Sequence, residues 1–158
     1  MKNLIYLLFF LISTAQAQTL NLALGKDVSN SLNDGQSPAW MVSETFPVRS
    51  HYAVQVGYMN EGHQVGSKRD GITVLGEYKD RFTPTFSTAA YLGPYITSTT
   101  EPVDDTHYRD AYRTMLIAGY GLREQVSHHV GTAFRWLHVM SFHSKDADVF
   151  LMQVGYRN

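Results

Sequence analysis

The chain has no cysteine, little net charge, and no long apolar run beyond its first segment. Without cysteine, no disulfide can stabilise the fold. A formal net charge of −1 gives no case for nucleic-acid binding. No later stretch approaches the roughly 18 consecutive apolar residues that predict a membrane helix. Yet 44% of the residues are hydrophobic, so apolar side chains are plentiful but dispersed.

The first segment has the three parts of an export signal. Lys2 supplies a positive charge, residues 4–12 form an apolar run, and Ala15-Gln16-Ala17 is a small-x-small cleavage site. The apolar run is too short for a spanning helix. We therefore expect residues 1–17 to be a cleaved signal peptide. No cysteine follows it, which excludes a lipoprotein anchor.

The rest of the chain, residues 18–158, alternates apolar and polar residues in short segments. Such a period of two indicates β-strands. In the third segment, for example, Tyr52, Val54, Val56 and Tyr58 share one face. We predict eight strands, at residues 20–26, 39–48, 52–61, 71–79, 86–97, 111–122, 130–140 and 148–157. About 9 to 11 residues suffice to cross a membrane as a tilted strand.

The second face of these strands distinguishes a membrane barrel from a soluble one. A soluble barrel would turn its apolar face inward, whereas a membrane barrel turns it to lipid. The opposite face here carries Gln55, Glu61, Glu77, Lys79, Arg113, Arg135, Gln153 and Arg157. We therefore predict an all-β fold, an eight-stranded antiparallel up-and-down transmembrane β-barrel. Its interior should be filled by a salt-bridge network, which argues against a channel.

The predicted connections differ between the two ends. The short ones are 49–51, 80–85 and 123–129, and the mostly longer, more polar ones are 27–38, 62–70, 98–110 and 141–147. Outer-membrane barrels have short periplasmic turns and long outer loops. We expect a Gram-negative outer membrane, with both termini periplasmic. The partners expected for this chain are membrane lipid, lipopolysaccharide and the outer-membrane assembly machinery. That machinery usually recognises a terminal aromatic residue, whereas this chain ends in Asn158.

Residues that could take part in catalysis or bind a metal ion gather in the predicted outer loops. They are Glu61, His63, Asp70, Asp104, Asp105, His107, His138, Ser141, His143, Ser144, Asp146 and Asp148. Ester hydrolysis needs a nucleophile, a base and an acid that orients the base. Ser141 and His143 are two residues apart, and Asp146 or Asp148 could approach across the hairpin. His138 and Ser144 are the further candidates for base and nucleophile.

The final third of the chain, FRWLHVMSFHSKDADVFLMQVGYRN, loosely resembles the outer-membrane lipid A 3-O-deacylases. The resemblance implies an eight-stranded barrel with His-x-Ser on the penultimate strand and an acid on the last. Asp148 stands where the acid is expected. Met140 stands where the serine should follow His138, and Ser141-Phe142-His143 has the two residue types in reverse order. Ser141 also falls on the inward parity of its strand.

A second resemblance concerns the tract from Tyr58 to His63, with Arg69-Asp70-Gly71 and Gly93-Pro94-Tyr95. These residues resemble a group of small, poorly characterised proteobacterial outer-membrane proteins, which supports the barrel and adds no mechanism. Glu61 and His63 could form an acid–base pair. We prefer an inward Glu61 paired with Arg113 or Arg135.

Two further functions stay open. Asp104, Asp105, His107, His143 and Asp146 offer oxygen and imidazole ligands for a divalent cation, but no local spacing matches a known metal site. A non-catalytic barrel with polar outer loops for recognition needs no further coincidence. It is our preferred interpretation, with no cofactor and no defined metal site.

Overall fold

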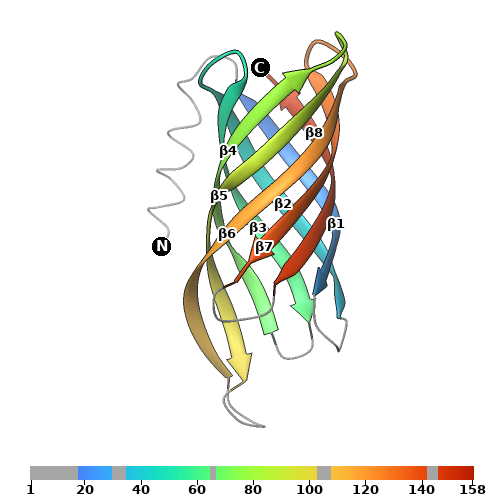
Figure 1. Ribbon diagram of the computed structural model, residues 1–158. Coiled ribbons are helices and arrows are strands. Elements are labelled where there is room, and N and C mark those ends of the chain that lie inside the picture. The colour runs from blue at the N-terminus through green and yellow to red at the C-terminus, as the bar shows by residue number, and fades with distance from the viewer. Residues whose placement is uncertain (1–17, 30–34, 65–66, 103–107, 142–145) are drawn as a thin grey trace.

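The chain folds as a closed barrel of eight antiparallel strands (Figure 1). The computed structural model describes residues 18–29, 35–64, 67–102, 108–141 and 146–158. The strands are β1 (Thr19–Ser29), β2 (Gln36–Pro47), β3 (Tyr52–Gln64), β4 (Ser67–Arg81), β5 (Phe86–Pro102), β6 (Tyr108–Gln125), β7 (Val130–Met140) and β8 (Ala147–Arg157). Each pairs with its chain neighbours, and β1 pairs with β8. The predicted fold class is confirmed.

The barrel has two distinct ends, which we call the turn end and the loop end. The turn end holds the connections 48–51, 82–85 and 126–129 together with residues 18 and 158. At the loop end lie the last residues of β1, β3, β5 and β7 and the first residues of β2, β4, β6 and β8. The predicted signal peptide, residues 1–17, lies outside the described residues. Within the described chain, no helix is long and apolar enough to cross a membrane.

The strands extend further at the loop end than the sequence predicted. The β3–β4 ladder reaches Gln64 and Ser67, and the β5–β6 ladder reaches Pro102 and Tyr108. The predicted loops 62–70 and 98–110 are therefore largely strand. Their polar composition predicted loops, and that prediction was wrong. Strands that pair with each other satisfy their backbone hydrogen-bonding groups even where neither carries an apolar face.

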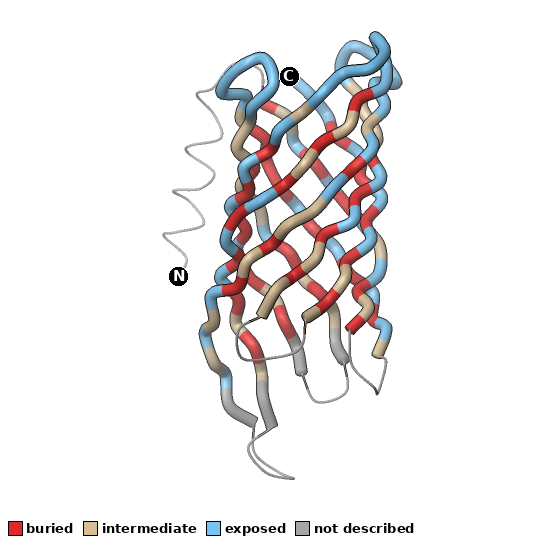
Figure 2. Tube along the Cα trace, viewed as in Figure 1, coloured by how far each residue is buried: buried red, intermediate tan, exposed pale blue. Residues whose placement is uncertain are grey.

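The alternation of faces agrees with the prediction. Along β1, Leu20, Leu22 and Leu24 are more than half exposed, whereas Asn21 and Ala23 are buried. Figure 2 shows the same alternation of buried and exposed positions along the other strands. The outward positions carry large apolar and aromatic side chains, including Val42, Ile72, Val74, Leu92, Ile96, Leu122, Phe134, Phe150, Met152 and Val154. The barrel thus presents an apolar belt to its surroundings.

The interior is layered rather than polar throughout, which corrects the prediction. On β7, buried Arg135 is followed toward the loop end by buried Leu137 and Val139. On β8, Leu151 and Val149 take the same places beyond Gln153. The buried apolar cluster also includes Met41, Met59, Leu75, Tyr95, Met115 and Ile117. An apolar layer therefore lies on the loop-end side of the polar one.

Candidate functional site

Strands β7 and β8 bring His138 and Asp148 together on the outer wall. The two residues are direct partners in the ladder and share the outward parity of Trp136. The Nδ1 atom of His138 lies 3.0 Å from Oδ1 of Asp148, and Trp136 donates from Nε1 to the same oxygen at 2.8 Å. A carboxylate oxygen accepts, so Nδ1 of His138 donates in this contact. This is the relation in which an acid orients a catalytic base.

The second ring nitrogen of His138 faces another carboxylate. Its Nε2 lies 4.0 Å from Oδ2 of Asp146, and Oδ1 of Asp146 accepts a hydrogen bond from the backbone N–H of Ser141 at 2.8 Å. Ser141 follows the last residue of β7, and the outward residue beyond His138 is Met140. The structure thus supplies a base and its orienting acid, and it gives Ser141 a backbone role in the β7–β8 connection.

The remaining predicted site residues fall largely outside what can be described. His143, Ser144, Asp104, Asp105 and His107 lie outside the described residues, as does the side chain of His63. Within the described part of the chain, no group of three or more histidine, aspartate or glutamate side chains is placed to hold a metal ion.

A second outward carboxylate is held in the same way on β3 and β4. The hydroxyl of Tyr58 donates to Oδ2 of Asp70, and the ring of Tyr58 lies 5.6 Å from that of Trp40. In each pair, the aromatic donor precedes its aspartate by 12 residues. Two strands separate the hairpins on either side of the ring, so the pairs occupy opposite walls. Both pairs suit a boundary between an apolar and an aqueous environment, because tyrosine and tryptophan combine an apolar ring with a polar atom.

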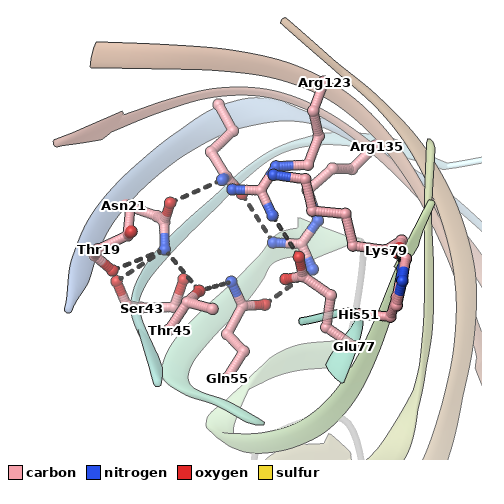
Figure 3. Close-up of polar contacts among 11 residues, drawn as sticks. Thr19, Asn21, Ser43, Thr45, His51, Gln55, Glu77, Lys79, Arg123 and Arg135 are labelled. Carbon is pink, nitrogen blue, oxygen red and sulfur yellow. Dashed lines mark hydrogen bonds and ion pairs between the residues drawn. The ribbon is translucent and has the colours of Figure 1, made fainter. Parts of the chain in front are cut away.

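A closed ring of hydrogen bonds crosses the interior (Figure 3). Arg135 donates to Oε1 of Gln153 at 2.8 Å and to Oε1 of Gln55 at 2.9 Å. Gln153 donates to Asn21 at 2.8 Å. Asn21 and Gln55 both donate to Oγ1 of Thr45, at 3.0 and 3.3 Å. Five strands thereby contribute to one network.

Arg135 lacks the carboxylate partner that the sequence analysis proposed for it. Its guanidinium carbon lies 4.0 Å from the centre of the Tyr91 ring, and the side chain is completely buried. The charge is therefore stabilised by two amide oxygens and an aromatic face. The signal for this ring was the inward parity of Gln55 and Gln153, which the sequence analysis recognised without pairing them.

Two interior ion pairs flank the apolar layer. On the turn-end side, Arg123 contacts Glu77. On the loop-end side, Arg69 contacts Glu61 at 2.9 Å, and both side chains are buried. The interior ion pairing is confirmed. The partner of Glu61 was wrongly predicted, because Arg113 or Arg135 was expected and the structure pairs it with Arg69. The predicted strand 71–79 stopped short of Arg69, so this arginine was treated as part of a loop.

The turn end has a cationic opening that was not predicted from the sequence. A cavity of about 370 Å³ there is lined by Arg49, Lys79, Arg81, Arg123 and Arg157. Three of these were assigned to turns or to no particular face. Only closure of the barrel brings them to one opening, because they come from the β2–β3 turn, β4, β6 and β8.

Comparison with known proteins places the fold and nothing finer. No protein-family model and no curated protein matches the chain. The N-terminal β-barrel domain of OprF from Pseudomonas aeruginosa has 13% identity and a TM-score of 0.70, covering 90% of this chain and 100% of that one. Ail, the attachment invasion locus protein of Yersinia pestis, has 11% identity and a TM-score of 0.64, covering 90% and 97%. Neisserial surface protein A has 12% identity and a TM-score of 0.65, covering 89% and 95%. The fold is that of eight-stranded outer-membrane β-barrels.

Proposed function

We propose that this chain is a non-catalytic, non-conducting barrel of the Gram-negative outer membrane, with its loop end at the cell surface. The observation that carries the proposal is the combination of an apolar outer belt with a lumen filled by side chains. The belt fits a lipid environment, because only the outward half of each strand must meet hydrocarbon. The filled lumen fits a structural or recognition role better than transport.

The lumen is obstructed at three levels. The Arg135 ring spans five strands, the apolar layer packs beyond it, and the Glu61–Arg69 pair lies nearer the loop end. An eight-stranded barrel has an interior only wide enough for side chains. Passage of a solute would require buried polar groups to separate without new partners, at roughly 1–3 kcal/mol for each group.

A recognition role is supported by the shape of the loop end. The β5–β6 ladder continues to Pro102 and Tyr108, whereas β7 and β8 have 11 residues each. About 9 to 11 residues cross the membrane, so this hairpin projects beyond the belt. Asp110 lies on the projecting part and is exposed. A rigid barrel carrying a projecting polar hairpin suits contact with a surface partner or with lipopolysaccharide.

Single cysteines test the location and the orientation, because the native chain has none. Asp110→Cys places a thiol at the loop end, and Ser50→Cys places one in an exposed turn. A membrane-impermeant maleimide should label Asp110→Cys in intact cells and Ser50→Cys only after the outer membrane is permeabilised. Ala89→Cys, which is buried, is the matched control and should react only after denaturation. The reverse labelling pattern would overturn the orientation.

Conductance tests the other half of the proposal. The purified barrel in a planar bilayer should give no stepwise current, because the interior layers occupy the lumen. The variant Leu137→Ala shortens a completely buried side chain of the apolar layer, and its current is compared with that of the unmodified chain. Regular single-channel steps from the unmodified chain would contradict the proposal.

A second candidate function is ester hydrolysis at the outer wall, and the His138–Asp148 contact favours it. The two residues stand where the resemblance to the lipid A 3-O-deacylases implies a base on the penultimate strand and an acid on the last. Met140 stands at the position of the expected nucleophile, and Asp146 faces the free nitrogen of His138. We rank this function second for those two reasons. Its test is loss of an acyl chain from lipid A that depends on His138.

A further inference from the structure

The turn end of the barrel opens into a hollow that the proposed function does not use. The cavity of about 370 Å³ adjoins a second hollow of about 570 Å³. Both are lined by Lys79, Arg81, Arg123 and Arg157. We call the two together the vestibule. Its size falls in the range of about 300–1,000 Å³ that is typical of small-molecule sites.

The charge of the vestibule is strongly one-sided. Arg49 joins the four shared cations, and the acidic residues of the lining are Glu77 and Glu124. Glu77 is already engaged by Arg123. In the described part of the chain, no ion pair joins Lys79, Arg81 or Arg157 to an acidic side chain. This excess is local, because the whole chain carries a formal charge of −1.

The vestibule is blind, so it can hold a ligand but not pass one. Thr45 and Gln153, members of the Arg135 ring, belong to its lining, as does the Glu77–Arg123 pair. In Figure 3, Lys79 and His51 lie beside Glu77. Charges at the bottom of a cleft with low-dielectric walls produce a stronger attraction for counter-ions than charges on an open surface.

Two of the cations stand on backbone segments that are each hydrogen-bonded to a histidine of a neighbouring turn. Nδ1 of His51 donates to the carbonyl of Lys79 at 3.0 Å, and the N–H of Lys79 donates to the carbonyl of His51 at 2.7 Å. The same reciprocal pair joins His129 and Arg157, at 3.0 and 2.7 Å. Both histidines precede their partner by 28 residues. The backbones that carry Lys79 and Arg157 are therefore held in place, so a ligand has to order only their side chains.

We propose that the vestibule binds a small polyvalent oxyanion of the phosphate class. Guanidinium groups match phosphate oxygens bidentately, and several cations around one opening favour a ligand with more than one negative charge. Arg81 and Arg157 provide the forks, and Lys79 provides a point charge. Such a ligand enters from the turn end. In the orientation proposed above, that is the periplasmic side, although binding itself does not depend on that orientation.

The test is calorimetric titration of the full protein, extracted from membranes in detergent, with inorganic pyrophosphate. We expect saturable binding that weakens as salt is added, because the attraction is electrostatic. Arg81→Gln combined with Arg157→Gln should weaken it by about tenfold or more. Lys26→Gln, which removes an exposed cation from the outer wall of β1, is the matched control and should leave it unchanged.

Three outcomes would overturn the proposal. They are the absence of saturable binding, equal binding by the double variant, and tighter binding of citrate than of pyrophosphate, since citrate carries carboxylates only. Heat-modified gel mobility of each variant shows whether the barrel is folded. If the double variant fails to fold, Lys79→Gln alone replaces it, with a smaller loss of affinity expected. None of these results bears on location or conductance, so failure here leaves the proposed function standing.

Discussion

Nδ1 of His138 lies 3.0 Å from Oδ1 of Asp148, and both side chains project from the outer wall of the barrel. The same carboxylate oxygen accepts a hydrogen bond from Trp136. One acid therefore serves two donors near the loop end. A catalytic acid would hold its histidine in this way, but so would a girdle that satisfies polar atoms at a membrane interface.

Removing the shared acceptor should cost more than removing either donor. Asp148→Ala leaves the donors of Trp136 and His138 without it, and we expect unfolding free energy to fall by about 1–3 kcal/mol. Asp148→Asn keeps an acceptor oxygen and should cost less. Urea unfolding in lipid vesicles measures both. His138→Ala is the control, because Asp148 then retains Trp136; a larger loss from this control would show that the acid is not the centre of the cluster.

Arg135 should prove important through amides rather than through a carboxylate. Arg135→Met removes the guanidinium group that donates to Gln55 and Gln153. Two buried amide oxygens then lose their partner, at an expected cost of roughly 1–3 kcal/mol in unfolding free energy. Replacing all three residues with Met and Leu should recover part of that loss, because the two glutamine oxygens are then removed together with their donor, and within the ring the oxygen of Asn21 alone loses its partner. The readout is the urea midpoint for loss of heat-modified mobility. Equal destabilisation in the single and triple variants would contradict this account of the ring.

Removing one member of the Glu77–Arg123 pair should destabilise the barrel more than removing Arg135 from the ring. Arg123→Ala leaves a buried carboxylate unpaired, and we expect a loss of about 3–5 kcal/mol in unfolding free energy. Glu77→Gln combined with Arg123→Gln removes both charges and should cost less. Equilibrium unfolding of both variants under identical lipid conditions makes the comparison. A milder effect from the single variant would mean that the pair contributes no net interaction.

Closure of the barrel depends on Gly25. A Cβ atom there would lie 1.7 Å from the carbonyl oxygen of Phe150, so β1 and β8 could not pair as they do. We expect Gly25→Ala to reduce the fraction of chains with folded gel mobility. Gly76→Ala is the matched control, since its Cβ would meet the nearest backbone oxygen, that of Leu92, at an ordinary 3.5 Å. Equal folding yields would rule out a steric requirement at Gly25.

The fold was largely predictable because each strand carries its own signal. Alternation placed Gln55 of β3, Arg135 of β7 and Gln153 of β8 on the inner face, where all three are buried, since the period of a strand is two whatever lies beside it. The loop-end extensions were not predictable in this way. Residues 98–102 lie beyond the apolar belt, so the backbone pairing that makes them strand leaves no trace in hydrophobicity.

The candidate site was only partly predictable. His138 and Asp148 were proposed on opposite strands, and the ladder brings them together. The partners of Arg135 and Glu61 depend on closure across the lumen, which no local spacing encodes. The vestibule depends on it too, because Arg49 and Arg157 stand more than a hundred residues apart in the sequence.

The most direct test of a non-catalytic barrel is a lipid A mass spectrum from a Gram-negative host that expresses the chain. Variants of His138, Asp148, Ser141, His143 and Ser144 are run beside it, with folding in the outer membrane checked by heat-modified mobility. We predict that all spectra match that of the host without the chain. Loss of a hydroxyacyl chain that is restored in His138→Ala or Asp148→Ala would contradict it and establish a deacylase.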